Sequence, residues 1–137
     1  MMISTRGRYA LRVMLDLAEH ERGMYVPLRD IAQRQGISEK YLESIIAVLS
    51  KAGLVQALRG KGGGYRLAEE PGAYTVGRIL KLAEGSLAPV ACLEGDVNQC
   101  IRADQCRTLP LWEGLGKVID AYLEQFTLAD LMQQRRV

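Results

Sequence analysis

The chain has 137 residues, of which 48% are hydrophobic and 25% charged, and this composition is typical of one soluble globular domain rather than of a disordered chain. Its apolar runs are shorter than the ~20 residues of a membrane helix, and the first twelve residues carry three arginines without the apolar core of a signal peptide, so we expect a cytoplasmic protein with no membrane partner. The net charge of +2 does not by itself indicate nucleic-acid binding, but residues 1–72 carry 11 Lys and Arg against 8 Asp and Glu (+3), whereas residues 73–137 carry 7 against 8 (−1).

The first three elements that we expect are helices. Ser4 or Thr5 can cap a helix that ends near residues 22–23, and a second, short helix fits residues 28–35, with Gly36 in the C-terminal cap position. Ser38 can cap a third helix that Gly53 ends, because its apolar residues have the spacing of one buried face. These residues are Leu42, Ile45, Ile46 and Leu49.

The second and third helices, joined by a short turn containing Gly36, have the arrangement of a helix-turn-helix, whose second helix enters the DNA major groove. Taken alone, this pattern also fits an ordinary helical domain, because short helices joined by a glycine turn are common.

A predicted β-hairpin follows and favours DNA binding. Residues 54–58 and 65–68 read as two strands around the glycine-rich tip 60–64, and the hairpin carries Arg59, Lys61 and Arg66. A nucleotide-binding P-loop would need the lysine after the last glycine and a helix next, whereas here Lys61 lies among the glycines and a strand follows. An exposed hairpin without a ligand is the other interpretation. A helix-turn-helix with a basic wing makes DNA binding the stronger hypothesis.

The C-terminal half is predicted to contain two helices separated by a long loop. Residues 75–84 form a short helix that Gly85 closes, the loop spans residues 86–110, and a long helix starts after Pro110. An apolar stripe on the long helix could pack on the chain's own core, but the small front half cannot easily cover it, so we predict a dimerisation helix. The stripe consists of Leu111, Leu115, Val118, Ile119, Tyr122, Leu123 and Phe126.

The fold class that we predict is mainly α, a winged helix-turn-helix with a β-hairpin wing and a long C-terminal dimerisation helix. Residues 1–72 would be the DNA-binding domain, and residues 73–137 would hold the short helix, the cysteine loop and the dimerisation helix. The expected partners are a second copy of the chain and double-stranded DNA with two-fold related half-sites. We do not expect an enzyme, because the sequence offers no convincing nucleophile and base and its one histidine, His20, reads as a surface residue.

Three cysteines, Cys92, Cys100 and Cys106, fall within fifteen residues of this loop. An odd number argues against a disulfide framework, and a structural zinc site normally needs four ligands. Thiolates favour an iron-sulfur centre, although the spacing is not that of a ferredoxin. A reversible thiol switch and inert cysteines are the other possibilities. The nearby Glu94, Asp96 and Asp104 could add an oxygen ligand or merely keep the loop solvated.

Three stretches of the sequence resemble the winged-helix regulator family that includes the iron-sulfur cluster regulator IscR, the nitric-oxide sensor NsrR and the cysteine metabolism regulator CymR. They are residues 4–11, residues 37–43 and residues 53–65, and the resemblance covers nearly the whole chain. It implies a homodimeric transcription factor whose cysteine loop holds an iron-sulfur cluster through Cys92, Cys100 and Cys106. It also places a set of residues of the third helix and the wing near DNA, namely Ser38, Lys40, Tyr41, Glu43, Ser44, Arg59 and Lys61.

The resemblance leaves the fourth cluster ligand unassigned. IscR-like members carry a histidine three residues after the last cysteine, where this chain has Leu109, and NsrR-like members use an aspartate near the start of the partner chain, where this chain has Arg8. A carboxylate, His20, water, a small thiol or a residue of the other subunit could serve. We favour [2Fe-2S] over [4Fe-4S], and a sensor that controls cluster biogenesis or related genes, over the alternative of a cluster-free regulator of cysteine metabolism or a thiol switch.

Overall fold

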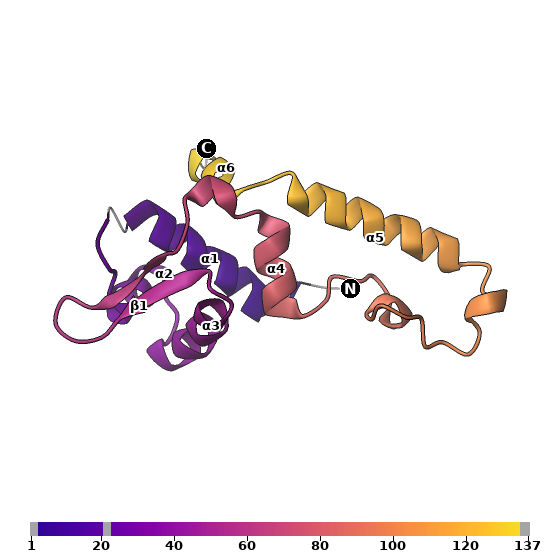
Figure 1. The fold of residues 1–137 in the computed structure, drawn as a ribbon, viewed down its shortest axis with the longest axis horizontal. Coiled ribbons are helices and arrows are strands. Elements are labelled where there is room, and N and C mark those ends of the chain that lie inside the picture. Colours follow the sequence, from indigo (N-terminus) through magenta and orange to yellow (C-terminus); the bar gives the residue numbers. More distant parts are fainter. Residues whose placement is uncertain (1–2, 21–22, 135–137) are drawn as a thin grey trace.

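The computed structural model describes residues 3–20 and 23–134. Within them the chain forms a winged-helix part, from which a long helix and the preceding loop extend to one side (Figure 1). The α-helices and strands follow in this order: α1 (Thr5–His20), α2 (Leu28–Gln35), α3 (Glu39–Lys51), β1 (Val55–Leu58), β2 (Gly64–Leu67), α4 (Val76–Glu84), α5 (Leu109–Glu124) and α6 (Leu128–Gln133). Short 3₁₀ turns lie at residues 71–73, 91–93 and 103–105.

The helix-turn-helix forms where the capping residues predict it. Ser4 precedes α1, and its hydroxyl oxygen accepts the Gly7 N–H at 3.2 Å. Gly36 ends α2 in the left-handed conformation (φ 65°), which glycine adopts at little cost. The Ser38 hydroxyl oxygen accepts the Tyr41 N–H at 3.2 Å at the start of α3. The predicted buried stripe of α3 is confirmed, because Leu42, Ile45, Ile46 and Leu49 are all buried.

The wing is a two-stranded antiparallel sheet in which β1 pairs with β2, with Val55 opposite Leu67 and Leu58 opposite Gly64. Each strand starts one residue away from the predicted position, at Val55 and Gly64. A single bridge between Val26 and Tyr65 ties the wing to the chain before α2. Gly64 (φ 145°) makes this approach possible, because a Cβ there would overlap the Val26 carbonyl.

The main core crosses the predicted division at residue 72. Residues of α1, α2 and α3 pack in one buried cluster with Tyr74, Ile79 of α4 and Leu128 of α6. The Tyr74 hydroxyl donates to the Leu54 carbonyl at 2.7 Å and accepts the backbone N–H groups of Ala68 and Glu69. Burial raises the pKa of this hydroxyl. Tyr74 therefore fixes the exit of the wing against the start of β1, and the two predicted units share one core.

The C-terminal region differs from the prediction in three respects. Helix α5 starts at Leu109 with Pro110 in its first turn, where the missing proline N–H costs no hydrogen bond. It ends at Glu124, so Phe126 is not part of the long helix as predicted: its carbonyl accepts the Val76 N–H at 2.8 Å. A separate helix, α6, follows and begins with a capping box formed by Thr127 and Asp130.

Candidate nucleic-acid interface and cysteine loop

The exposed side of α3 carries the DNA-contacting residues predicted from the sequence. Ser38, Lys40, Tyr41, Glu43 and Ser44 are all exposed, at the cap and in the first turns of the helix. The hydroxyls of Ser38 and Ser44 already bind the backbone, since Ser44 donates to the Tyr41 carbonyl at 2.8 Å. The exposed polar groups of Lys40, Tyr41 and Glu43 take no part in these two bonds.

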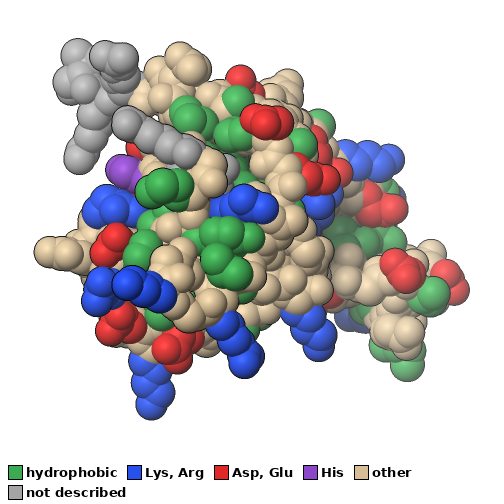
Figure 2. Space-filling view, turned by 60° about the vertical axis from the view of Figure 1, so that its left-hand side comes forward, with side chains coloured by type: hydrophobic (Ala, Val, Ile, Leu, Met, Phe, Trp, Pro, Cys, Tyr) green, Lys and Arg blue, Asp and Glu red, His purple; other side chains and the backbone are tan. Residues whose placement is uncertain are grey.

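A groove of about 500 Å³ separates α3 from the wing. Glu43, Ala47 and Ser50 line it from α3, and Leu58, Arg59 and Gly60 line it from the wing. Arg59 and Lys61 are both exposed, and Lys and Arg side chains project from this side of the molecule with acidic residues among them (Figure 2). The structure therefore brings Glu43 and Arg59 to one groove, with Lys61 farther out on the wing tip.

Two residues that the sequence interpretation did not select lie beside this surface. Arg29, in the first turn of α2, lines a second groove with Lys61 under the wing tip. Tyr9 of α1 makes an edge-to-face contact with Tyr41, with ring centroids 5.7 Å apart. The sequence could have indicated Arg29 as a residue of this surface, because it is a basic residue at the start of the first helix of the helix-turn-helix. The contact of Tyr9 with Tyr41 joins α1 to α3 and has no signal in the sequence.

A buried carboxylate holds α2 against α1. The side chain of Asp16 is fully buried, and it accepts two hydrogen bonds from Arg34 at 2.7 and 3.0 Å and one from Gln35 Nε2 at 2.8 Å. The hydrogen bond to Asp16 raises the pKa of Arg34. Arg12 of α1 also donates to the Gln35 side chain at 3.0 Å. These bonds fix the first helix of the helix-turn-helix, and with it the turn that leads into α3.

The cysteine loop, residues 86–108, holds three free thiols. Cys100 is exposed, and Cys92 and Cys106 are half-buried. The Cys106 thiol lies 3.4 Å from the Thr108 hydroxyl at the start of α5. That hydrogen bond, together with backbone N–H groups of Thr108 and Leu109 and the charge of Arg102, lowers the pKa of Cys106.

The donor set of the loop suits a thiolate-bound cluster in its chemistry, but the loop does not hold the donors together. Among the described residues, groups of three or more Cys, His, Asp and Glu side chains gathered around one point are absent. The side chain of Asn98 accepts the Cys100 N–H at 2.8 Å, while its buried Nδ2 amide lacks a hydrogen-bond partner within the described ranges. An acceptor beside Cys100, such as a sulfide or thiolate, would satisfy that amide. The loop would have to close to bring the three thiols together.

Helix α5 presents a row of exposed apolar side chains. Leu111, Leu115, Val118 and Tyr122 have 62%, 40%, 65% and 59% of their surface exposed, and none of the residues of α5 is buried. Leu123 and the neighbouring Phe126 instead pack against Val76, Leu80 and Leu87 of their own chain. The predicted stripe is thus divided between an inward side and an outward side, and the outward side is an exposed apolar row of the kind that marks an interaction surface.

None of the described helices is long and apolar enough to cross a membrane.

The chain is similar to known transcriptional regulators over its whole length. Residues 3–134 match the family model Rrf2, described as an iron-dependent transcriptional regulator. The chain is 41% identical to the HTH-type transcriptional regulator IscR of Vibrio atlanticus, with 100% of this chain and 78% of that protein covered. It is 39% identical to the IscR of Yersinia enterocolitica, of which it covers 82%.

Two solved structures support the same assignment. The IscR of T. potens is 39% identical with a TM-score of 0.76, over 100% of this chain and 94% of that one. CymR, the global cysteine regulator of B. subtilis, is 35% identical with a TM-score of 0.79, over 99% of both chains. The predicted family resemblance and the winged-helix fold are confirmed by these matches.

Proposed function

Because the chain belongs to the Rrf2 family of transcriptional regulators, we propose that it is a homodimeric DNA-binding regulator that senses iron-sulfur or redox status through a cluster held on its cysteine loop. It is not an enzyme, since the relatives are named as transcriptional regulators. The observation that carries the proposal is that three free cysteines lie on one loop between α4 and α5, in a chain 41% identical to the HTH-type transcriptional regulator IscR of Vibrio atlanticus. Genes of cluster biogenesis or related genes are the targets that the family resemblance suggests.

In this proposal α3 and the wing bind DNA, and α5 forms the dimer. The exposed face of α3 reads the major groove with Lys40, Tyr41 and Glu43, while Arg59 and Lys61 of the wing bind the DNA backbone or the minor groove. The outward side of α5 pairs with the same side of a second copy, which sets the spacing between the two copies of α3. Two-fold related half-sites in the DNA would match that symmetry.

Cys92, Cys100 and Cys106 would hold the cluster as thiolates, and Asn98 would donate a hydrogen bond beside Cys100. When bound, the cluster would supply a centre whose charge and integrity change with redox conditions. The fourth ligand must come from outside this cysteine set. Leu109, the first residue of α5, has no donor atom in its side chain, so a carboxylate, His20, water, a small thiol or a residue of the second subunit remains the candidate. We favour a two-iron cluster.

The test is the visible spectrum of protein purified without oxygen, with iron and acid-labile sulfide measured per dimer. We expect visible absorption with matched iron and sulfide, and a colourless but folded dimer for Cys100→Ala. An unchanged spectrum in Cys100→Ala would remove that residue from the ligand set. Wild-type protein that stays colourless after cluster reconstitution would overturn the cluster proposal and leave the DNA-binding fold untouched.

A cluster-free thiol switch is the second candidate, and three observations favour it. The described thiols are not gathered around a common point, and the pKa of Cys106 is lowered, which gives this thiol more thiolate character at neutral pH. The similarity to the cysteine regulator CymR also points this way. If the protein stays colourless, DNA binding before and after mild oxidation should differ, and a change that reducing agent reverses would support this candidate.

A further inference from the structure

Helix α4 lies between the cysteine loop and the DNA-binding helices. It packs against α1 on one side and α5 on the other, and its last residue, Glu84, directly precedes the glycine at which the loop begins (Figure 1). A change in the shape of the loop would therefore act first on the C-terminal end of α4.

The carboxylate of Glu84 is bound to the start of α1. Its Oε1 atom accepts the Ser4 N–H at 2.9 Å and the Ser4 hydroxyl at 2.7 Å, and the hydroxyl oxygen of Ser4 in turn accepts the Gly7 N–H. An anion is favoured here because the N-terminus of a helix carries partial positive charge. Gly7 is needed for this approach, since a Cβ at that position would overlap Glu84 Oε1. Glu84 thus joins residues that are 80 positions apart in the chain.

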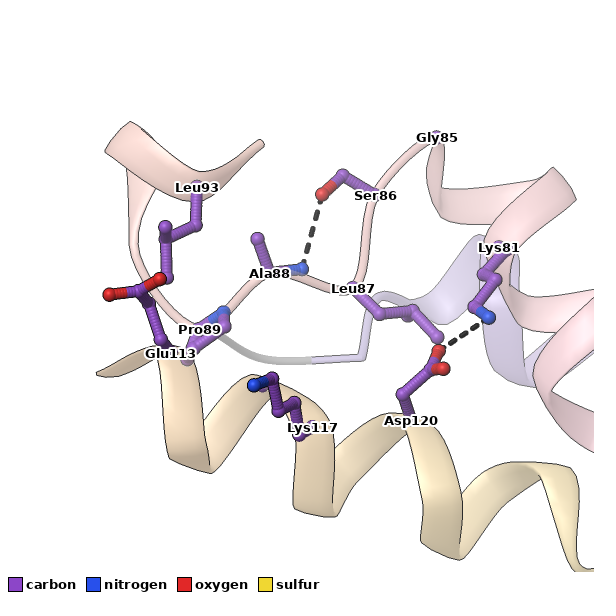
Figure 3. A pocket seen from close by; sticks show the side chains of 11 residues that line it. Lys81, Gly85, Ser86, Leu87, Ala88, Pro89, Leu93, Glu113, Lys117 and Asp120 are labelled. Carbon is purple, nitrogen blue, oxygen red and sulfur yellow. Dashed lines mark hydrogen bonds and ion pairs between the residues drawn. The ribbon is translucent and has the colours of Figure 1, made fainter. Parts of the chain in front are cut away.

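The other side of α4 is held to α5 by charges. Lys81 forms an ion pair with Asp120 (Figure 3) and a second one with Glu124 at 3.4 Å. The hydrogen bond to Asp120 raises the pKa of Lys81. A Cβ at Gly77 would overlap the Glu124 carboxylate, so α5 also approaches α4 closely at this point. The last turn of α4 is therefore held to α5 by Lys81 and to α1 by Glu84.

A cleft borders the start of the cysteine loop. A cleft of about 500 Å³ separates residues 85–89 and Leu93 from α5, and Figure 3 shows these residues facing Glu113 and Lys117 across it. Gly85 has a left-handed backbone (φ 82°) that other residues adopt only with strain. Leu87 of this segment is buried against Leu80 of α4, and Leu123 of α5 packs on the same cluster, so a change in the shape of the loop at this point would be transmitted to the end of α4.

At its other end this connection reaches the DNA-binding surface. Tyr9 lies in the second turn of α1 and contacts Tyr41 at the exposed start of α3. Arg12, one turn later, donates to the Gln35 side chain and backbone carbonyl at the end of α2. A small displacement of α1 at Ser4 would therefore shift both helices of the helix-turn-helix through these contacts.

We propose that Glu84 is the positioning residue through which the state of the cysteine loop reaches α1 and the DNA-binding face. The loop pulls or releases the end of α4, the Glu84 carboxylate keeps or loses its bonds to Ser4, and α1 shifts against α3. This proposal rests on the proposed cluster-sensing function, and it identifies the contact by which the sensor and the DNA-binding surface are coupled.

The test compares DNA affinity with and without the cluster. The probe is a duplex selected by the wild-type protein from random sequence, and binding is measured by fluorescence anisotropy on cluster-loaded and cluster-free dimers. Wild type should show an affinity ratio between the two forms of roughly 5 to 150-fold, the usual range of allosteric coupling. Glu84→Ala should bring the ratio to within about twofold of one, with iron content per dimer unchanged.

Two further variants make the result specific. Gly7→Ala keeps the charge and pushes the flexible Glu84 carboxylate away from Ser4, so the fold should persist while the ratio falls as in Glu84→Ala. Glu69→Ala removes the same charge from the exposed pair with Arg78, and its ratio should equal that of wild type. This pair of variants keeps the proposal testable even if Glu84→Ala does not fold.

The outcomes separate the two proposals. A wild-type ratio near one would overturn cluster sensing and the role of Glu84 together. A wild-type ratio well above one that is retained in Gly7→Ala or in folded Glu84→Ala would overturn the role of Glu84 alone. Equal losses of ratio in Glu84→Ala and Glu69→Ala would assign the effect to net charge and also overturn it.

Discussion

The winged-helix part and the C-terminal arm of this protein are packed in opposite ways. In the winged-helix part, helices α1 to α3 share one buried cluster of apolar side chains, and the charged Asp16 is buried with partners for its carboxylate. In the arm, formed by residues 86–124, α5 has no buried residue and four large apolar side chains are exposed along it. The first part buries its apolar side chains within its own chain, whereas the arm leaves apolar side chains exposed. In our proposal, a second copy of the chain covers these side chains and the cysteine loop binds a cluster.

A leucine-to-alanine substitution should have very different effects in the two regions. Leu42→Ala removes a fully buried side chain from α3 and should lower the free energy of unfolding by roughly 2–5 kcal/mol, because a cavity remains. Leu111→Ala, in an exposed position on α5, should change the free energy of unfolding of the monomer by less than about 0.5 kcal/mol. Urea titration at concentrations low enough to give monomers measures both. Equal losses would mean that the arm packs on its own chain.

The second prediction concerns the outward face of α5. Val118→Asp places a charge in the middle of the exposed apolar row and should dissociate the dimer, because the carboxylate would be buried without a partner. Val97→Asp, on the cysteine loop, is a matched control with 68% exposure of the valine. Sedimentation velocity should give a monomer for Val118→Asp and a dimer for the control. Retention of the dimer in Val118→Asp would move the interface away from this face.

The elements of the winged-helix part that depend on local signals could be predicted from the sequence. The bounds of α2 agree with the prediction, and the start of α3 agrees at Ser38, because caps and glycines act within a few residues of the chain. The bounds of the wing strands differ by one residue, since pairing is fixed partly by the Val26 bridge, which sequence patterns do not reveal.

Helix α6 and the contacts of α4 could not be predicted in the same way. Helix α6 has six residues, too few for a reliable periodic pattern, and Leu128 is buried through contacts with distant elements. The Thr127 to Asp130 capping box was the one local signal of its start. The bonds between Glu84 and Ser4 span 80 positions, and the spacing of the three cysteines contains no information about how far apart they lie in space.

The third prediction tests the wing as part of the DNA surface. Lys61→Ala removes one exposed cation from the wing tip and should reduce the slope of log affinity against log salt by about 1, because one fewer counterion is released. Lys51→Ala, at the exposed end of α3, removes the same charge away from the wing tip and should leave the slope unchanged. Anisotropy titrations of one duplex at several salt concentrations measure the slopes. Equal slopes for Lys61→Ala and wild type would exclude this lysine from phosphate contact.

The smallest expected effect lies at the junction of the cysteine loop and α5. The Thr108 hydroxyl and nearby N–H groups lower the pKa of Cys106, so its thiolate fraction at neutral pH should exceed that of an ordinary cysteine, whose pKa is about 8.5. In metal-free protein, the rate of Cys106 alkylation by iodoacetamide, followed by peptide mass spectrometry, should therefore rise with a midpoint at lower pH than this value. Thr108→Val removes the largest cause and should move the midpoint upward, toward the ordinary value. An unchanged midpoint in Thr108→Val would mean that the hydroxyl does not bind the thiolate in solution. The start of α5 would then not orient Cys106 in the absence of a ligand or a second subunit.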